Sequence, residues 1–149
     1  VEKPGNLGAV LRSADGAGVD AVIICDPKTD LYNPNLIRSS TGAFFSVTCV
    51  VSSFEETAKW LRKNNITIFT AQLQDSVVYY DADFTRGTAL VFGTESEGLT
   101  DKWREISDKK IFIPMLGTSD SLNVSVSMAV LCYEALRQRN FNHSNGTGI

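Results

Sequence analysis

Apolar residues in this 149-residue chain form short continuous runs that alternate with stretches of helical periodicity. The runs are rich in β-branched residues, which is typical of strands buried on both faces of a sheet. The predicted strands span residues 20–25, 45–51, 66–71, 88–92 and 110–114, and the predicted helices span 6–17, 33–42, 54–64, 100–107 and 122–139. This alternation predicts an α/β fold with a mostly parallel sheet flanked by helices.

The helix predicted at 54–64 shows the ordinary amphipathic pattern. Phe54, Ala58 and Leu61 form one apolar stripe, with charged residues on the other positions. Acidic residues in its first turn and basic residues in its last turn complement the helix dipole. The pattern of this helix indicates a structural role.

The length is that of one domain, and the net charge of −3 with a pI near 5.1 is unlike that of a stand-alone nucleic-acid binder. Any affinity for nucleic acid must come from a local patch, from a dimer, or from a segment outside this sequence. No apolar run approaches the roughly 20 residues that span a bilayer, so no membrane association is expected.

Cysteine and histidine usage argues against metal and disulfide chemistry. Cys25, Cys49 and Cys132 are odd in number, lack C-x-x-C spacing and lie in apolar runs, which indicates buried reduced thiols and a cytoplasmic protein. The single histidine, His143, lies in a polar segment at 141–149 that is expected to be a disordered tail. No metal site is predicted.

The segment Ile111–Ser125 carries the strongest functional signal. A β-branched strand meets Pro114, opens into a loop of small residues and enters a long apolar helix. Such a strand end presents backbone amides and carbonyls to a ligand in α/β proteins. A structural interpretation is also open, because Ser119, Asp120 and Ser121 are all suitable helix caps.

A second strand-to-loop segment lies at Leu90–Gly98. It lacks the spacing of dinucleotide-binding and phosphate-binding loops, so neither ligand is indicated. Glu95 follows the strand beside Gly93, and a carboxylate there suits a cationic ligand. Thr100 is expected to cap the next helix.

The N-terminal segment Lys3–Ala14 predicts a helix capped by Asn6, with its apolar stripe facing the core. Arg12 lies on a different side of this helix, beside Gly8, where an anion can approach. An ordinary capped helix with a surface arginine explains the segment equally well. In the helix predicted at 33–42, Arg38 and Ser39 are polar and are candidates for contact with phosphate, although a simple connecting helix is the alternative.

These three motifs, in this order, resemble those of the SpoU/TrmH family of RNA ribose methyltransferases in the SPOUT superfamily. They are Asn6-x-Gly8-Ala9-x-x-Arg12, Gly93-x-Glu95, and Ile113-Pro114-Met115-x-Gly117 with Ser121-Leu122-Asn123. The resemblance covers residues 1–140, which are expected to form one methyltransferase domain. It implies that the first strand of the family and any accessory RNA-binding domain precede this sequence.

The resemblance implies a C-terminal deep trefoil knot, with the 93–139 region threaded through a loop, and a homodimer with the active site at its interface. It implies methyl transfer from S-adenosylmethionine to a ribose 2′-hydroxyl of tRNA or rRNA. Asn6, Arg12, Glu95, Ser121 and Asn123 fall on the functional positions. In the family, the arginine is proposed to help deprotonate the hydroxyl. Steering of phosphate and stabilisation of the alkoxide suit a permanently protonated guanidinium better.

The strand-end loops carry few side chains able to recognise adenine, so backbone groups are expected to bind S-adenosylmethionine. The expected cofactor-binding residues are Phe92, Gly93, Thr94, Ile113, Met115, Gly117 and Leu122. Gly93→Val is expected to block the cofactor while the fold survives. The apolar helix 122–139 has too little polar face for a monomer, which favours the homodimer.

Two other functions compete with this hypothesis. A non-catalytic RNA-binding or assembly subunit would keep the fold and lose the chemistry, but the five functional positions are all present. An enzyme acting on a phosphorylated metabolite would need a phosphate-binding loop, and the sequence shows none.

Overall fold

The computed structural model describes residues 4–26, 47–94, 98–119 and 122–139, with the side chains of residues 4–6 excepted. The helix predicted at 33–42 lies outside these ranges. The elements, in chain order, are α1 (Pro4–Ala17), β1 (Ala21–Cys25), β2 (Thr48–Ser52), α3 (Phe54–Lys63), β3 (Thr67–Ala71), β4 (Val77–Val78), the 3₁₀ turn η2 (Tyr79–Asp81), β5 (Thr88–Val91), α4 (Asp101–Ile106), β6 (Lys109–Phe112) and α5 (Val124–Gln138).

The α/β fold with parallel strands is confirmed. The described strands form two sheets, a pair β1-β2 and a four-stranded sheet in the order β4-β6-β3-β5, and every pairing is parallel. No backbone pairing joins the two sheets within the described ranges. The carboxyl ends of β3, β5 and β6 therefore meet at one edge of the larger sheet, where α/β proteins bind ligands.

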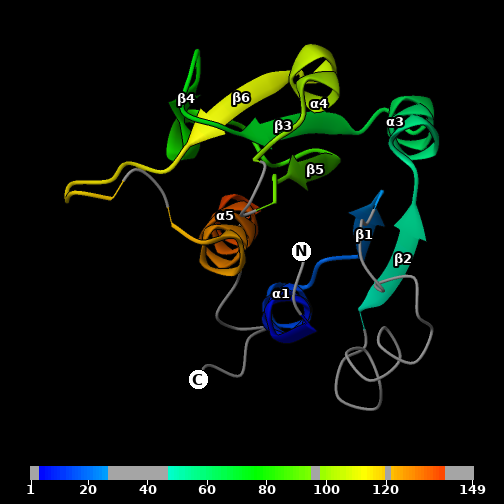
Figure 1. Ribbon diagram of the computed structural model, residues 1–149, viewed down its shortest axis with the longest axis horizontal. Helices are drawn as coiled ribbons and strands as arrows, with labels where there is room; N and C mark the ends of the chain where they lie inside the picture. Colours follow the sequence, from blue (N-terminus) through cyan, green and yellow to red (C-terminus); the bar gives the residue numbers. More distant parts are fainter. Residues whose placement is uncertain (1–3, 27–46, 95–97, 120–121, 140–149) are drawn as a thin grey trace.

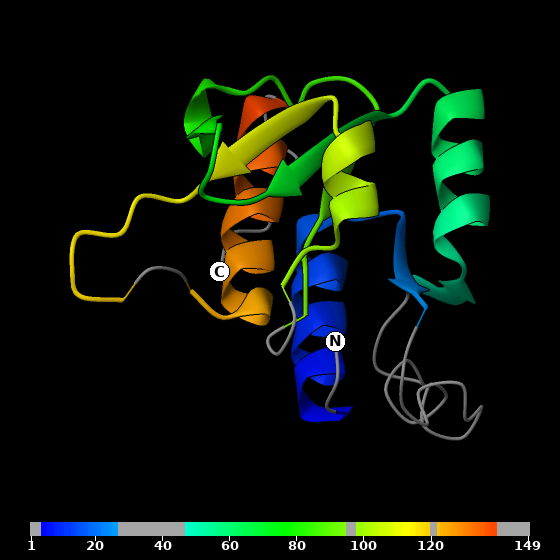
Figure 2. The same ribbon diagram turned by 45° about the horizontal axis from the view of Figure 1, so that its top comes forward.

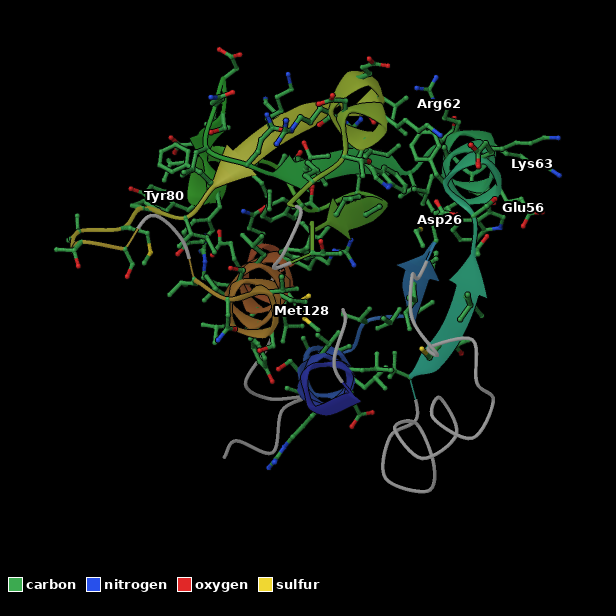
Figure 3. The ribbon with its side chains drawn as sticks, in the orientation of Figure 1. Asp26, Glu56, Arg62, Lys63, Tyr80 and Met128 are labelled. Atoms are coloured by element: carbon green, nitrogen blue, oxygen red, sulfur yellow. The ribbon has the colours of Figure 1, made fainter. Side chains whose placement is uncertain are left out.

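Helices cover both faces of the larger sheet. α1 and α5 lie side by side on one face (Figures 1 and 2), where Leu131 of α5 packs with Phe69 and Ile111. Met128 of α5 points toward the core that α1 shares with β1 (Figure 3). On the opposite face, Ile68 packs with Trp103 of α4 and with α3. Ile68 and Phe69 are adjacent in β3, so their side chains point to opposite faces of the sheet and pack against different helices.

Two predicted helix starts differ from the structure. α1 begins at Pro4, so Asn6 lies inside its first turn and is not the cap; proline is favoured at a first helical position, where its missing N–H costs nothing. α5 is capped by Asn123, and not by Ser119, Asp120 or Ser121. Thr100 does occupy the cap position of α4, but its side chain makes no capping hydrogen bond.

Two short elements, β4 and η2, were not predicted from the sequence. β4 adds two residues to the edge of the larger sheet, and such a short pairing leaves no periodic signal. No described helix has the length and apolar character required to cross a bilayer.

Candidate functional site

A cavity of about 520 Å³ lies at the edge where the strands of the larger sheet end. Its volume is within the range of small-molecule sites. The ends of β3, β5 and β6 and the start of α5 all contribute to it. Its lining residues are Ala71, Gln72, Leu73, Phe92, Gly93, Thr94, Gly98, Leu99, Ile111, Phe112, Ile113, Leu122, Asn123, Val124, Ser127 and Leu131.

The structure brings most of the expected cofactor-binding residues together at this cavity. They are Phe92, Gly93, Thr94, Ile113 and Leu122. Met115 and Gly117 are not among the lining residues. The loop 113–119 projects away from the body of the molecule (Figure 1), and Leu116 at its tip is fully exposed.

Gly93 is required by a close approach of the chain to itself. A Cβ atom built on Gly93 would lie 2.1 Å from the carbonyl carbon of Gly98 and 2.2 Å from the backbone nitrogen of Leu99. Thr94 and Gly98 form an antiparallel bridge, in which the Gly98 N–H donates to the Thr94 carbonyl over 2.9 Å. The second motif is therefore a tight loop closed at its base, and Glu95 lies outside the described residues.

Asn123 joins the cavity to the start of α5. Its Oδ1 accepts hydrogen bonds from the Val126 N–H (2.9 Å) and from the Ser125 hydroxyl (3.0 Å). The Ser127 hydroxyl donates to the Leu122 carbonyl over 3.3 Å. The third motif thus builds the helix cap and one wall of the cavity with the same residues, and Ser121 lies outside the described residues.

The end of β3 contributes a wall that the sequence analysis did not nominate. The Gln72 N–H donates to the Ile111 carbonyl (2.9 Å), and its side-chain oxygen accepts from the buried Thr70 hydroxyl (3.1 Å). Thr70 in turn lies 2.7 Å from the Ser107 hydroxyl. Because β3 was predicted to end at residue 71, the rule that parallel strands end at one edge could have identified Gln72.

Arg12 lies away from this cavity within a single chain. It is exposed on α1 and is not among the lining residues. The side chain of Asn6 is not described, and Arg38 and Ser39 lie outside the described residues. The structure therefore gathers the second and third motifs at one cavity and leaves the first motif on a separate helix.

The described lining of the cavity carries no ionisable side chain. The lining residue Leu131 is followed by Cys132, a buried thiol whose pKa is raised to about 11 by burial. A neutral buried thiol of this kind is a poor nucleophile. Within the described residues, no three potential ligands gather into a metal site.

Comparison with known proteins identifies the family. Residues 1–133 match the model of the SpoU rRNA Methylase family. A 23S rRNA (uridine(2479)-2′-O)-methyltransferase of Streptomyces viridochromogenes is 38% identical over 143 residues, which cover 91% of this chain and 50% of the relative. The 23S rRNA (guanosine-2′-O-)-methyltransferase RlmB of Escherichia coli K12 is 40% identical over 140 residues, covering 93% and 58%. The chain spans about half the length of these curated relatives.

Solved structures give the same result. A crystal structure of an RNA 2′-O ribose methyltransferase superposes with a TM-score of 0.80 at 46% identity, covering 94% of this chain and 54% of the other. The SpoU methyltransferase AviRb from Streptomyces viridochromogenes, in complex with AdoMet, superposes with a TM-score of 0.81 at 35% identity, covering 94% and 58%. The chain belongs to the SpoU rRNA methylase family.

Proposed function

We propose that this chain, residues 1–140, forms the methyltransferase domain of an enzyme that methylates the ribose 2′-hydroxyl of RNA with S-adenosylmethionine. The observation that carries the proposal is the meeting of the second and third motifs at one cavity on the carboxyl edge of the sheet. The relatives support it, because they are named 23S rRNA 2′-O-methyltransferases and one structural relative contains AdoMet.

The residues around the cavity fit S-adenosylmethionine. Gly93 keeps one wall free of a side chain, and Phe92, Ile113 and Leu122 supply apolar surface for the adenosine. The described lining holds no cation that would repel the sulfonium. These residues, with Thr94 and the exposed backbone of the strand ends, would hold the molecule. When bound, it supplies an electrophilic methyl group on a sulfonium, which is already a good leaving group.

The chain's own contribution is mainly alignment of the reacting groups, which alone can lower a barrier by several kcal/mol. In the proposed scheme, Asn123 and Ser121 orient the groups at the start of α5, and Glu95 contributes a carboxylate from the second motif. Asn6 and Arg12 contact the ribose and its phosphate. The Arg12 guanidinium stabilises negative charge developing on the 2′-oxygen, because it remains protonated.

A homodimer could bring Arg12 to a cavity that it does not line in its own chain. Val126 and Tyr133 on α5 are 42% and 49% exposed, and they lie on one side of the helix with partly buried Val130. The Tyr133 hydroxyl lies against Gly16 of α1, but about half of this side chain and of Val126 stays exposed, and this apolar stripe suits a second copy of the chain. We include the trefoil knot of the SPOUT fold in the same proposal.

The RNA class favoured by the relatives is rRNA, since the curated ones named above act on 23S rRNA. tRNA is the alternative substrate, because one structural relative is described as an A. aeolicus TrmH/SpoU tRNA modifying enzyme. Arg38 and Ser39 are proposed to contact the RNA backbone.

Single-turnover methyl transfer with saturating S-adenosylmethionine tests the proposal. A labelled methyl group should appear on the ribose 2′-oxygen of 23S rRNA transcripts. Transfer to tRNA alone would show that the substrate is tRNA and not rRNA. Binding of S-adenosylmethionine and RNA without any transfer would favour the non-catalytic subunit.

Arg12→Ala gives the sharpest test of mechanism. S-adenosylmethionine binding should be unchanged, because Arg12 is exposed and does not line the cavity of its own chain. Single-turnover transfer should fall by about two to four orders of magnitude, the range for a proton-transfer or oxyanion-stabilising group. Arg12→Lys should restore little, because an ammonium lacks the planar fork. Wild-type rates for Arg12→Ala would exclude this role.

A further inference from the structure

Trp60 is an unusual residue on an otherwise ordinary helix. α3 buries Thr57, Ala58 and Leu61, as its apolar stripe predicts, but Trp60 is 52% exposed. The other tryptophan, Trp103 of α4, is only 8% exposed. An indole that is half exposed presents a flat apolar face and an N–H donor on which another molecule can stack.

Three cations lie on the same turns of α3 as this indole. Lys63 is one turn after Trp60 on the same side of the helix, as Glu56 is one turn before it, whereas Arg62 lies on another side. Lys59, Arg62 and Lys63 are all exposed, and Figure 3 shows Arg62 and Lys63 extending outward from the end of the helix. None of the three makes an ion pair with a described residue. In contrast, Lys102 on the neighbouring helix pairs with Glu55 over 3.4 Å.

The helix dipole explains part of this pattern. Cations in a last turn stabilise a helix, which accounts for Arg62 and Lys63 without any ligand. It does not account for the exposure of Trp60 one turn earlier. We call Lys59, Trp60, Arg62 and Lys63 the α3 patch.

We propose that the α3 patch binds single-stranded RNA outside the active site, with an unpaired base stacked on Trp60 and the adjacent phosphates on the cations. Aromatic rings beside basic side chains are the usual means of holding unpaired nucleotides. Charge complementarity favours this occupant, since the last turns of α3 carry three exposed cations on a chain of net charge −3, whereas its acidic residues Glu55 and Glu56 lie in the first turn. The inference rests on the proposed RNA substrate.

The position of the patch indicates anchoring and not catalysis. α3 ends just before the amino end of β3, whereas the cavity lies at the carboxyl ends of the strands. The α3 patch therefore binds a different part of the RNA from the one that is methylated. Changes in the patch should weaken RNA binding and leave S-adenosylmethionine affinity unchanged.

Intrinsic fluorescence of the full chain tests the stacking. A short oligouridylate should quench the signal, whereas heparin, a polyanion without bases, should not. Trp60→Phe should lose the quenching, and Trp60→Ala should weaken oligouridylate binding by about 5- to 100-fold, the range for one stacked base. Equal quenching by heparin, or unchanged affinity of Trp60→Ala, would overturn the proposal. The proposal would also be overturned if acrylamide failed to quench Trp60 fluorescence in the RNA-free chain, because another protein surface would then cover the indole.

The salt dependence of oligouridylate binding tests the cations. The triple variant K59Q/R62Q/K63Q should lower the slope of log affinity against log salt by about 2, since each lost phosphate contact contributes about 0.7 for a single strand. A matched control, K102Q/R104Q, removes cations that are already paired and should change the slope by much less. An unchanged slope in the triple variant would contradict the inference but not the proposed function. A wild-type chain that binds no RNA would contradict both.

Discussion

At Gly93, the backbone conformation excludes any side chain, because the Cβ atom would overlap the backbone of Gly98 and Leu99. The sequence led us to expect that Gly93→Val would block the cofactor and spare the fold. In the structure, the added side-chain atoms would overlap the backbone of Gly98 and Leu99. The substitution should therefore displace this loop, and cofactor binding should be lost together with some stability.

Gly93→Ala should therefore both abolish S-adenosylmethionine binding and lower the free energy of unfolding by about 1–3 kcal/mol, the usual cost of overpacking. Gly117→Ala is the matched control, because nothing lies within 4 Å of a Cβ there. Calorimetry and thermal unfolding measure the two effects. If Gly93→Ala bound and unfolded like the wild type, the tight closure of this loop would be excluded.

Cys132 should make the stability of the protein depend on alkaline pH. Burial raises the pKa of its thiol from 9.0 to about 11, so its contribution to stability is fully present below about pH 9. As the pH rises toward 11, only the unfolded chain loses the thiol proton, and the free energy of unfolding should fall by about 2–3 kcal/mol.

The measurement is urea unfolding between these pH values, compared with Cys132→Ala. The variant should be less stable at neutral pH because of the lost packing, but its stability should fall less steeply with pH. Parallel curves for the two proteins would show that Cys132 does not contribute.

At the scale of elements, the cap of α5 and the third motif share Asn123. Asn123→Ala should lower the free energy of unfolding by about 1 kcal/mol, because the Val126 N–H loses its partner. Asn123→Asp should preserve stability, since aspartate caps equally well, but it replaces the amide by a carboxylate.

Methyl transfer then separates the two roles of this residue. If the amide group orients the reacting groups, Asn123→Asp should remain folded and lose transfer. Retained transfer in Asn123→Asp with loss only in Asn123→Ala would reduce Asn123 to a structural cap. Thermal unfolding with single-turnover kinetics measures both quantities.

The hydrophobic pattern predicted where the helices and strands lie, but it predicted their first and last residues less accurately. All five strands and four helices were found where β-branched runs and apolar stripes placed them. The start of α5 was missed because Ser119, Asp120, Ser121 and Asn123 are similar as caps, and three-dimensional packing selects among them.

Motif order indicated the cavity, but the sequence could not place all its residues. Gln72 escaped notice because nothing in its own neighbourhood is unusual; its position depends on the pairing of β3 with β6. The exposure of Trp60 was equally invisible, since a tryptophan in an amphipathic helix is compatible with either face.

At the scale of the whole molecule, the apolar stripe on α5 makes the oligomeric state testable. The chain should be a dimer at micromolar concentration by light scattering. Tyr133→Arg should produce monomers by placing a charge on the stripe, and it should also reduce methyl transfer if Arg12 acts across the interface. Tyr80→Arg, a similarly exposed tyrosine on η2, should remain dimeric. A monomeric wild type would rule out the shared active site.

The packing of α1 against α5 has a consequence for the order of events during synthesis. Leu7 and Leu11 share a core with Met128 and Cys132. At about 5–20 residues per second, a ribosome takes roughly 6–24 s to translate from Leu7 to Met128. After it emerges, α1 therefore waits, with its apolar side uncovered, until α5 has been made. A nascent chain of this kind is a natural client for chaperones, and its ligand cavity does not exist until translation reaches α5.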